Sequence, residues 1–204
     1  RSAVPLIIGI PKEIYPEERR VAATPATVLR LRKMGLDVHV QAGAGEGARF
    51  TDAAYQESGA TIVAEADALW STADIVLKVR PPMPRPGGGT NEALLLKPGA
   101  MLSSFIWPAQ NRTLLDDLVA RRATALAMDC VPRITRAQKM DALSAMGNIA
   151  GYRAIIEAAE HFGRFIPGQI TAAGKVAPAR VLIVGAGVAG LAAIAAAKAL
   201  GAQV

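Results

Sequence analysis

The sequence predicts an α/β protein with two lobes, each built on a parallel β-sheet, the second of them incomplete within these 204 residues. Short apolar segments alternate with helical segments along the first lobe, and this order is typical of a parallel sheet with helices on both faces. A last apolar segment runs into a glycine-rich turn and a helix. The apolar fraction of 51% with only 4% aromatic residues also indicates a core of Ala, Val, Leu and Ile.

The first lobe contains six predicted strands separated by helices. The strands are expected over Leu6–Ile10, Asp37–Ala42, Thr61–Ala64, Asp74–Val79, Met101–Ile106 and Thr124–Asp129. The helices are expected over Thr24–Met34, Thr51–Gly59, Ala66–Thr72 and Asn111–Arg122. Thr24-Pro25 is a strong helix start, because threonine caps free N–H groups and proline is tolerated at the first helical position.

Two segments separate or connect these elements. Pro81–Gly89 is rich in proline and glycine and predicts an exposed loop rather than helix or sheet. Arg136–Phe162 has a long helical pattern, and Ile170–Gly174 follows it. We therefore predict a first lobe over residues 1–144, and over residues 145–204 a linking helix with the start of a second lobe.

The second lobe begins with a motif that fits dinucleotide binding. Val181–Val184 predicts a buried strand of a parallel sheet, and Gly185, Gly187 and Gly190 form GxGxxG before the helical stretch Leu191–Leu200. The first glycine allows a tight turn, the second lets the backbone approach a pyrophosphate, and the third lets helix and strand pack closely. The helix N-terminus then faces the phosphates with free N–H groups. GxGxxG alone is weak evidence, but between a strand and a helix it predicts a nucleotide site.

One part of this motif lies beyond the sequence. The acidic residue that binds the adenosine ribose is expected about 20 residues after the glycines, and the sequence ends at Val204. We therefore expect an N-terminal portion of a longer protein. The motif does not decide between NAD and NADP.

Composition excludes several classes of function. The net charge is +6, but the arginines are dispersed and no basic run interleaves with aromatic residues, which argues against nucleic-acid binding. The one cysteine, Cys130, excludes an intramolecular disulfide and fits a reducing compartment. The uncharged stretch Val181–Ala197 is too short and too rich in glycine for a membrane span. No cluster of residues has metal-ligand spacing, so no metal is expected.

The whole chain resembles one family. Three segments resemble the opening shared by alanine dehydrogenases and proton-translocating nicotinamide nucleotide transhydrogenases: Gly9–Glu13, Arg20–Pro25 and Ile75–Val79. Two segments resemble the transhydrogenases only: Ser104–Asn111 and Val131–Asp141. The match is completed by Gly151–Ala154, Gly168–Lys175 and the glycine motif, in the same order.

This resemblance implies the NAD(H)-binding component of a transhydrogenase, known as domain I. It implies two Rossmann-like lobes and direct hydride transfer from NADH to NADP⁺ held on a partner component, without an acid or base. It also implies a membrane-embedded partner that translocates protons, a homodimer, and a peripheral location on the cytoplasmic side of the bacterial inner membrane. NAD rather than NADP as the cofactor of this component is likewise what the resemblance implies.

One departure separates the two relatives. In alanine dehydrogenases a catalytic histidine follows the strand equivalent to residues 102–106, and here that position matches Trp107. Reduction of an imine or ketone needs a proton donor beside the substrate, whereas hydride transfer between two nicotinamide rings needs only close, aligned rings. Arg20 and Lys78 match residues that bind the substrate carboxylate in alanine dehydrogenase. A soluble alanine dehydrogenase-like enzyme and a non-catalytic NAD(H)-sensing module therefore stay as alternatives.

The candidate cofactor site combines a polar loop with the glycine turn. Arg133, Gln138 and Asp141 resemble the transhydrogenase loop that contacts the nicotinamide half of the cofactor, and their donors and acceptors suit a pyrophosphate, a carboxamide and ribose hydroxyls. Spacing alone favours a polar helix start, with Thr135 as its cap and the other side chains solvated. The resemblance favours binding, and it extends the cofactor-binding residues to these: Lys139, Met140, Ser144, Gly185, Gly187, Val188 and Gly190.

Lys78 is unusual because it interrupts an apolar strand. A charge at such a position must reach solvent, a partner or a ligand. Without the histidine, we expect Lys78 and Arg20 to be members of structural ion pairs rather than substrate-binding residues.

Overall fold

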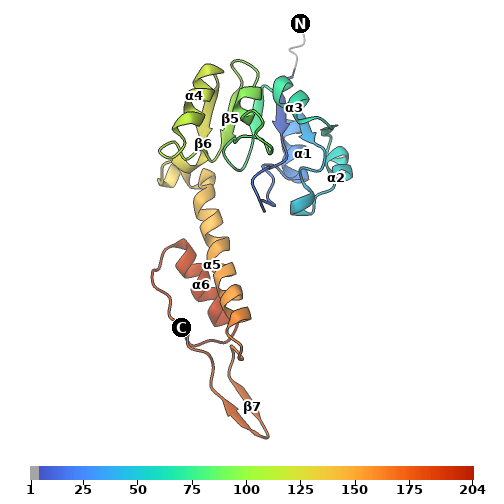
Figure 1. Ribbon diagram of the computed structural model, residues 1–204. Coiled ribbons are helices and arrows are strands. Elements are labelled where there is room, and N and C mark those ends of the chain that lie inside the picture. The colour runs from blue at the N-terminus through green and yellow to red at the C-terminus, as the bar shows by residue number, and fades with distance from the viewer. Residues whose placement is uncertain (1–4) are drawn as a thin grey trace. The chain divides into compact units, whose positions relative to one another are not determined.

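The computed structural model describes residues 5–204, which form two compact units that meet between Val131 and Pro132 (Figure 1). Among the described residues, no helix is both long and apolar enough to cross a membrane.

The first unit contains a six-stranded parallel sheet, which confirms the predicted α/β class. Its strands are β1 (Ile7–Ile10), β2 (Asp37–Gln41), β3 (Thr61–Val63), β4 (Ile75–Leu77), β5 (Met101–Ser104) and β6 (Thr124–Ala127). Their order, β3-β2-β1-β4-β5-β6, is that of a Rossmann fold. The order reverses between β1 and β4, so the loops that follow these two strands meet at the edge where such folds hold ligands.

Helices cover both faces of this sheet, as predicted. They are α1 (Pro25–Lys33), α2 (Asp52–Glu57), α3 (Ala66–Thr72) and α4 (Arg112–Ala120). One core joins β1 and β2 to α1 and α2, and includes Val28 and the fully buried Tyr55. The other joins β4 and β5 to α3 and α4, and includes Trp70. Thr24 and Thr51 cap α1 and α2 through their hydroxyl oxygens, which confirms both predicted helix starts.

Gly9 explains how closely α3 lies on the sheet. A Cβ atom at this position would be 2.8 Å from the Cβ of Ala73 and 2.9 Å from a methyl carbon of Leu69. The strand therefore needs glycine here for the helix to pack against it.

Short 3₁₀ turns and one loop complete the first unit. The turns are η1 (Glu46–Ala48), η2 (Glu92–Leu95) and η3 (Met128–Cys130). The predicted loop Pro81–Gly89 contains no helix or strand, and a single bridge joins Pro84 to Asn91 across it.

The second unit is built around two packed helices. It contains η4 (Thr135–Met140), α5 (Ala142–His161), the antiparallel hairpin of β7 (Gln169–Thr171) and β8 (Gly174–Val176), and α6 (Val188–Ala199). Figure 1 shows α5 and α6 side by side, in agreement with the contacts between them. The long helix predicted from Arg136 begins instead at Ala142, because Asp141 caps it and the preceding turn is a separate 3₁₀ helix. Thr135 is therefore not its cap.

The predicted buried strand Val181–Val184 is wrong in two respects. No strand pairs with it in the described chain, apart from a single parallel bridge between Arg180 and Gln203. Leu182 and Val184 are 89% and 92% exposed, whereas Val181 and Ile183 pack against the α5–α6 core. Side-chain burial in this segment thus alternates, as it does in a strand that is covered on one face only. A buried strand of a parallel sheet would need hydrogen-bonded neighbours and a covering layer on each face.

Candidate functional site

All the predicted cofactor-binding residues lie in the second unit, at the N-terminal ends of α5 and α6. The polar loop from Arg133 to Asp141 leads into α5, and the glycine turn leads into α6. Gly151 in the middle of α5 meets the start of α6, because a Cβ at Gly151 would be 2.0 Å from the carbonyl oxygen of Ala189. Asp141 precedes that crossing by ten residues, which is about 15 Å of helix. The two parts of the site are therefore held by one helix pair.

The glycine turn has a backbone conformation that depends on its glycines. Gly185 has φ +108°, and a Cβ at Gly190 would be 2.0 Å from the carbonyl oxygen of Gly185, so any side chain at Gly190 would break the turn. Gly187 is the N-cap of α6, and no side chain caps its N–H groups. Val188 begins the helix and is 44% exposed. Open backbone donors and a helix N-terminus fit a dinucleotide pyrophosphate.

The polar loop is a surface segment with one buried anchor. Ala137 is buried within η4, whereas Arg133, Gln138, Lys139 and Met140 are exposed. Guanidinium and amide groups on such a surface are available to a ligand. No hydrogen bond within residues 5–204 fixes the Gln138 side chain.

Asp141 has a structural contact as well as a predicted binding role. Its carboxylate accepts hydrogen bonds from the Ser144 backbone N–H at 2.9 Å and from the Ser144 hydroxyl at 2.5 Å. These bonds, chiefly the one from the hydroxyl, lower the pKa of Asp141 below its usual value. Asp141 is therefore an anionic cap of α5, and a carboxylate oxygen that accepts from Ser144 still has a lone pair for a ribose hydroxyl.

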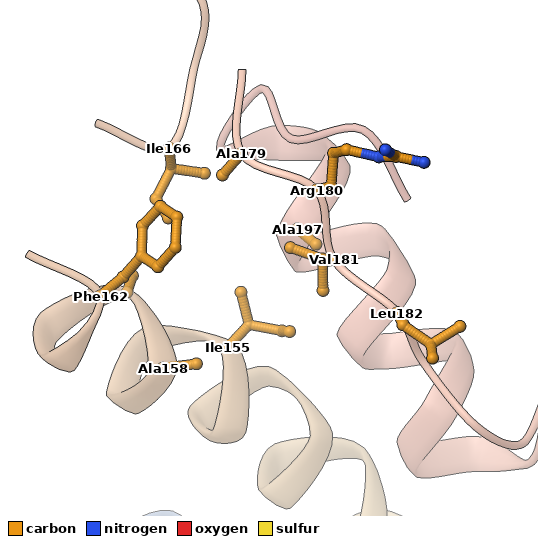
Figure 2. A pocket seen from close by; sticks show the side chains of 10 residues that line it. Ile155, Ala158, Phe162, Ile166, Ala179, Arg180, Val181, Leu182 and Ala197 are labelled. Atoms are coloured by element: carbon orange, nitrogen blue, oxygen red, sulfur yellow. The ribbon is translucent and has the colours of Figure 1, made fainter. Parts of the chain in front are cut away.

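The second unit also contains an apolar pocket, which is separate from the residues predicted to bind the cofactor. It has a volume of about 260 Å³ and lies between the C-terminal half of α5 and the segment before the glycine turn. Figure 2 shows Ile155, Phe162, Ile166 and Val181 around it. None of the predicted cofactor-binding residues lines this pocket.

In the first unit, Lys78 is buried between two carboxylates at the point where the strand order reverses. Its ammonium lies 2.7 Å from Glu13 Oε2 and 3.4 Å from Glu92 Oε2, and these three side chains are 0–3% exposed. Glu13 also accepts from the Val79 backbone N–H at 2.6 Å. Burial raises the pKa of Glu92, opposed by the nearby ammonium of Lys78. The expected ion-pair role of Lys78 is confirmed, and its ammonium is fully engaged within the protein.

Glu18 organises a second ion-pair cluster beside it. Its carboxylate accepts from Arg20 at 2.6 Å and from Arg80 at 2.7 Å, and only 5% of its side chain is exposed. The hydrogen bonds from Arg20 are the main cause that lowers the pKa of Glu18 to about 2. The expected ion pairing of Arg20 is confirmed. Arg80 also lies over the Tyr15 ring at 4.4 Å.

We expect Glu18→Gln to remove a contribution to stability that depends on pH. A lowered pKa in the folded state stabilises the protein above pH 4.5 and loses this effect as the pH falls toward 2. A shift of this size corresponds to at most about 3 kcal/mol in the free energy of unfolding at pH 7. Urea unfolding from pH 7 to pH 2.5 should show the gap between wild type and variant closing as the pH falls.

Glu46→Gln is the matched control, because Glu46 pairs with Lys12 at 3.9 Å and its side chain is 69% exposed. An exposed pair of this kind contributes little. A gap between wild type and Glu18→Gln that stays constant over this pH range would contradict the assignment.

Trp107 lies in a tight turn directly after β5. Its φ is +51°, and its side chain is 39% exposed and stacked on Phe105 with ring centres 6.2 Å apart. The backbone N–H groups of Ile106 and Trp107 donate to the two carboxylate oxygens of Asp129, at 2.6 and 3.1 Å. An indole cannot exchange a proton at neutral pH, and the adjacent carboxylate is occupied by backbone donors. This turn therefore offers no acid–base group.

Comparison with known proteins establishes the family. The family model for the N-terminal domain of alanine dehydrogenase/PNT matches residues 9–150, and the model for the C-terminal domain matches residues 154–204. The chain belongs to the alanine dehydrogenase/PNT family. The resemblance stated from the sequence motifs is thus confirmed, and the family is one of oxidoreductases.

Within this family the chain is more similar to transhydrogenases than to alanine dehydrogenases. It is 56% identical to the NAD(P) transhydrogenase subunit alpha of Cereibacter sphaeroides over 96% of this chain and 36% of that protein. It is 36% identical to the alanine dehydrogenase of Mycolicibacterium smegmatis over 98% of this chain and 52% of that protein. The solved transhydrogenase structure from Sinorhizobium meliloti superimposes with a TM-score of 0.89 at 43% identity, over 96% of this chain and 54% of that chain.

This alanine dehydrogenase/PNT chain therefore spans between about a third and about half of the length of the relatives it matches. In the relatives the matched region is followed or preceded by further residues.

Two residues with a part in this geometry were not among the predicted site residues. Gly151 packs on the backbone of α6, and Asp129 holds the Trp107 turn. Asp129 could have been found from its position, because it is a polar residue at the carboxyl end of a parallel strand and that edge of the sheet carries functional groups in such folds. The signal for Gly151 is a glycine inside a helix, which costs about 1 kcal/mol unless close packing requires it.

Proposed function

We propose that this chain is the NAD(H)-binding part of a proton-translocating transhydrogenase. It holds NADH and presents the nicotinamide to NADP⁺ on a partner domain. The observation that carries this proposal is the Trp107 turn, which has an indole and an occupied carboxylate where an amino-acid dehydrogenase needs a proton donor. Direct transfer between two rings has no such need.

In this proposal the residues of the second unit bind and orient the cofactor. The glycine turn holds the pyrophosphate with backbone N–H groups, and Val188 packs against the dinucleotide. Arg133, Gln138 and Asp141 hold the nicotinamide half, together with Lys139, Met140 and Ser144. The bound nicotinamide supplies the hydride, and these side chains fix where its ring lies. Alignment of reacting atoms contributes several kcal/mol to such reactions, of order 7–11 at best.

The partners in this proposal are an NADP(H)-binding domain and a membrane-embedded subunit that couples hydride transfer to proton movement. The chain itself would lie on the cytoplasmic side of the inner membrane as a peripheral homodimer. The high similarity to transhydrogenase alpha subunits supports this assignment of partners and place.

The rival function is that of an alanine dehydrogenase-like enzyme, which Arg20, Lys78 and a 36% identical relative favour. The ion pairs argue against it. Lys78 is fully buried and is engaged by Glu13 and Glu92, so its ammonium is not presented to a substrate carboxylate. Arg20 pairs with Glu18, although 39% of its side chain is exposed. A sensing module that binds NADH without turnover is the other alternative.

We expect Arg133→Ala and Asp141→Asn to weaken NADH binding by about tenfold each, since each removes a charge-assisted hydrogen bond. The measurement is an NADH titration of the full-length polypeptide, followed by nucleotide fluorescence. Arg153→Ala is the matched control, because Arg153 is exposed and pairs with Glu157 on the same helix α5. Unchanged affinity in both site variants would contradict the assigned loop. NADH oxidation by pyruvate plus ammonia would instead identify a dehydrogenase.

A further inference from the structure

Polar side chains bind both the N–H groups and the carbonyl groups of the Trp107 turn. Asp129 accepts the N–H groups of Ile106 and Trp107, as described above. Asn111 donates from its side-chain amide to the carbonyl oxygens of Ile106 and Trp107, at 2.8 and 3.2 Å. Side chains therefore engage both the N–H and the C=O groups of Ile106 and Trp107. The Trp107 carbonyl also accepts from the backbone N–H groups of Gln110 and Asn111, at 3.0 and 3.1 Å.

This arrangement holds a conformation that is unfavourable by itself. A tryptophan in the left-handed region is less stable than one in an ordinary backbone conformation, because its Cβ atom crowds the backbone. Such residues persist only where surrounding groups enforce them, and they gather at functional sites. The carboxylate of Asp129 is well suited to this task, because it has acceptors for both N–H groups. An asparagine offers one acceptor only, and its NH₂ group would face the other N–H.

Asp129 also lies where the chain leaves the first unit. It belongs to η3, directly after β6, and β6 pairs in parallel with β5, so the turns that follow both strands lie at the same edge of the sheet. Only Cys130, Val131 and Pro132 separate Asp129 from Arg133. The carboxylate thus holds the Trp107 turn by hydrogen bonds, and the backbone of the same residue leads within four residues to Arg133, where the polar loop starts.

We propose that Asp129 is a positioning residue for hydride transfer, which fixes the Trp107 turn and the origin of the polar loop through its two backbone hydrogen bonds. This inference rests on the proposed function. Asp129 touches neither reacting ring in this role. It limits how far the start of the loop can drift, and loss of reactant alignment lowers turnover more than it lowers binding.

The test uses Asp129→Asn in the full-length polypeptide combined with its NADP(H)-binding partner. We expect kcat for hydride transfer to fall by about tenfold or more, since a small misplacement far from the chemistry has effects of this order. The Kd for NADH should change by less than about threefold, because the glycine turn is untouched. Acrylamide should quench Trp107 more strongly in the variant, while Trp70, which is 1% exposed, stays protected.

Asp116→Asn is the matched control, because Asp116 is 69% exposed on α4 and pairs only with Arg112 at 3.7 Å. It should leave kcat, Kd and quenching unchanged. Asp129→Glu keeps two acceptors and should recover part of the lost turnover.

The possible outcomes distinguish failure of the positioning role of Asp129 from failure of the proposed function. Wild-type kcat and quenching in folded Asp129→Asn would overturn the positioning role, as would a lower Tm with unchanged kcat per folded molecule. If Asp129→Asn fails to fold, Asn111→Ala removes the side-chain bonds to the carbonyl groups of the same turn and leaves the backbone bonds to the Trp107 carbonyl in place. A loss of kcat in that variant supports the role, and unchanged kcat overturns it. Absence of NADH binding and hydride transfer in the wild type would instead overturn the proposed function.

Discussion

Gly190→Ala should weaken NADH binding by at least about a hundredfold, which corresponds to about 3 kcal/mol. A Cβ at this position would lie 2.0 Å from the carbonyl oxygen of Gly185, a backbone atom that cannot move without opening the turn. The turn and the first residues of α6 would both have to shift, and the N–H groups that face the pyrophosphate would shift with them. Isothermal titration of the full-length polypeptide with NADH measures the loss directly.

Gly147→Ala provides the control for this prediction. Gly147 lies in α5, and nothing is within 4 Å of a Cβ built there. Alanine in an open helical position should stabilise the protein by about 0.4–1 kcal/mol without changing NADH affinity. Near-wild-type affinity in Gly190→Ala would show that the glycine turn does not hold the cofactor.

Lys78→Met should lower the free energy of unfolding by about 3–5 kcal/mol, because it leaves two buried carboxylates without their cation. Glu13 and Glu92 are 2% and 3% exposed, so water cannot replace the lost ammonium. Burial already raises the pKa of Glu92, and without Lys78 this carboxyl should take up a proton more readily. A group with a raised pKa in the folded state stabilises the fold below its unfolded pKa, so the variant should regain stability as the pH falls.

Lys12→Met serves as the comparison for Lys78→Met in urea unfolding at pH 7 and pH 5. Lys12 pairs with Glu46 over 3.9 Å on the surface, and its loss should change stability by less than about 1 kcal/mol. Equal effects of the two lysine variants would mean that the buried cluster is not held together by charge.

The first unit could be predicted closely because its signals are local. Apolar runs end at glycine or proline, and Thr24-Pro25 and Thr51 start helices with side-chain caps that the structure confirms. The end of α1 is also determined by a local signal, since Gly35 adopts φ +83° after the last turn of the helix. The six strands follow from this alternation. Their order comes from the structure, since the rules for parallel sheets only narrow the possible topologies.

The second unit was harder to predict because the composition of a segment does not show whether neighbouring strands are present beside it. Val181–Val184 has the composition of a buried strand, but a strand needs neighbours that residues 5–204 do not supply. The start of α5 was placed six residues too early, because η4 has an apolar anchor at Ala137 that continues the helical pattern. The domain boundary near residue 145 stays a prediction, since contacts divide the chain after Val131 and the family models meet after residue 150.

The candidate site could be predicted only in part. GxGxxG has a mechanism that spacing reveals, and the close approach of Gly190 to Gly185 agrees with it. The polar loop rests on resemblance, because Arg133 and Gln138 are surface side chains that spacing alone cannot distinguish from solvated ones. The ion pair of Lys78 with Glu13 joins residues 65 positions apart in the sequence, which no local pattern indicates.

The most direct test of the proposed function is hydride transfer from NADH with deuterium in both C4 positions to an NADP⁺ analogue with a distinct absorbance. The full-length polypeptide would be mixed with its NADP(H)-binding partner, and the reduced analogue analysed by mass spectrometry. Direct transfer between two rings predicts that the deuterium appears in the product, that both components are required, and that Asp141→Asn slows the reaction. Product without deuterium, or reduction of pyruvate with ammonia by this polypeptide alone, would contradict the account.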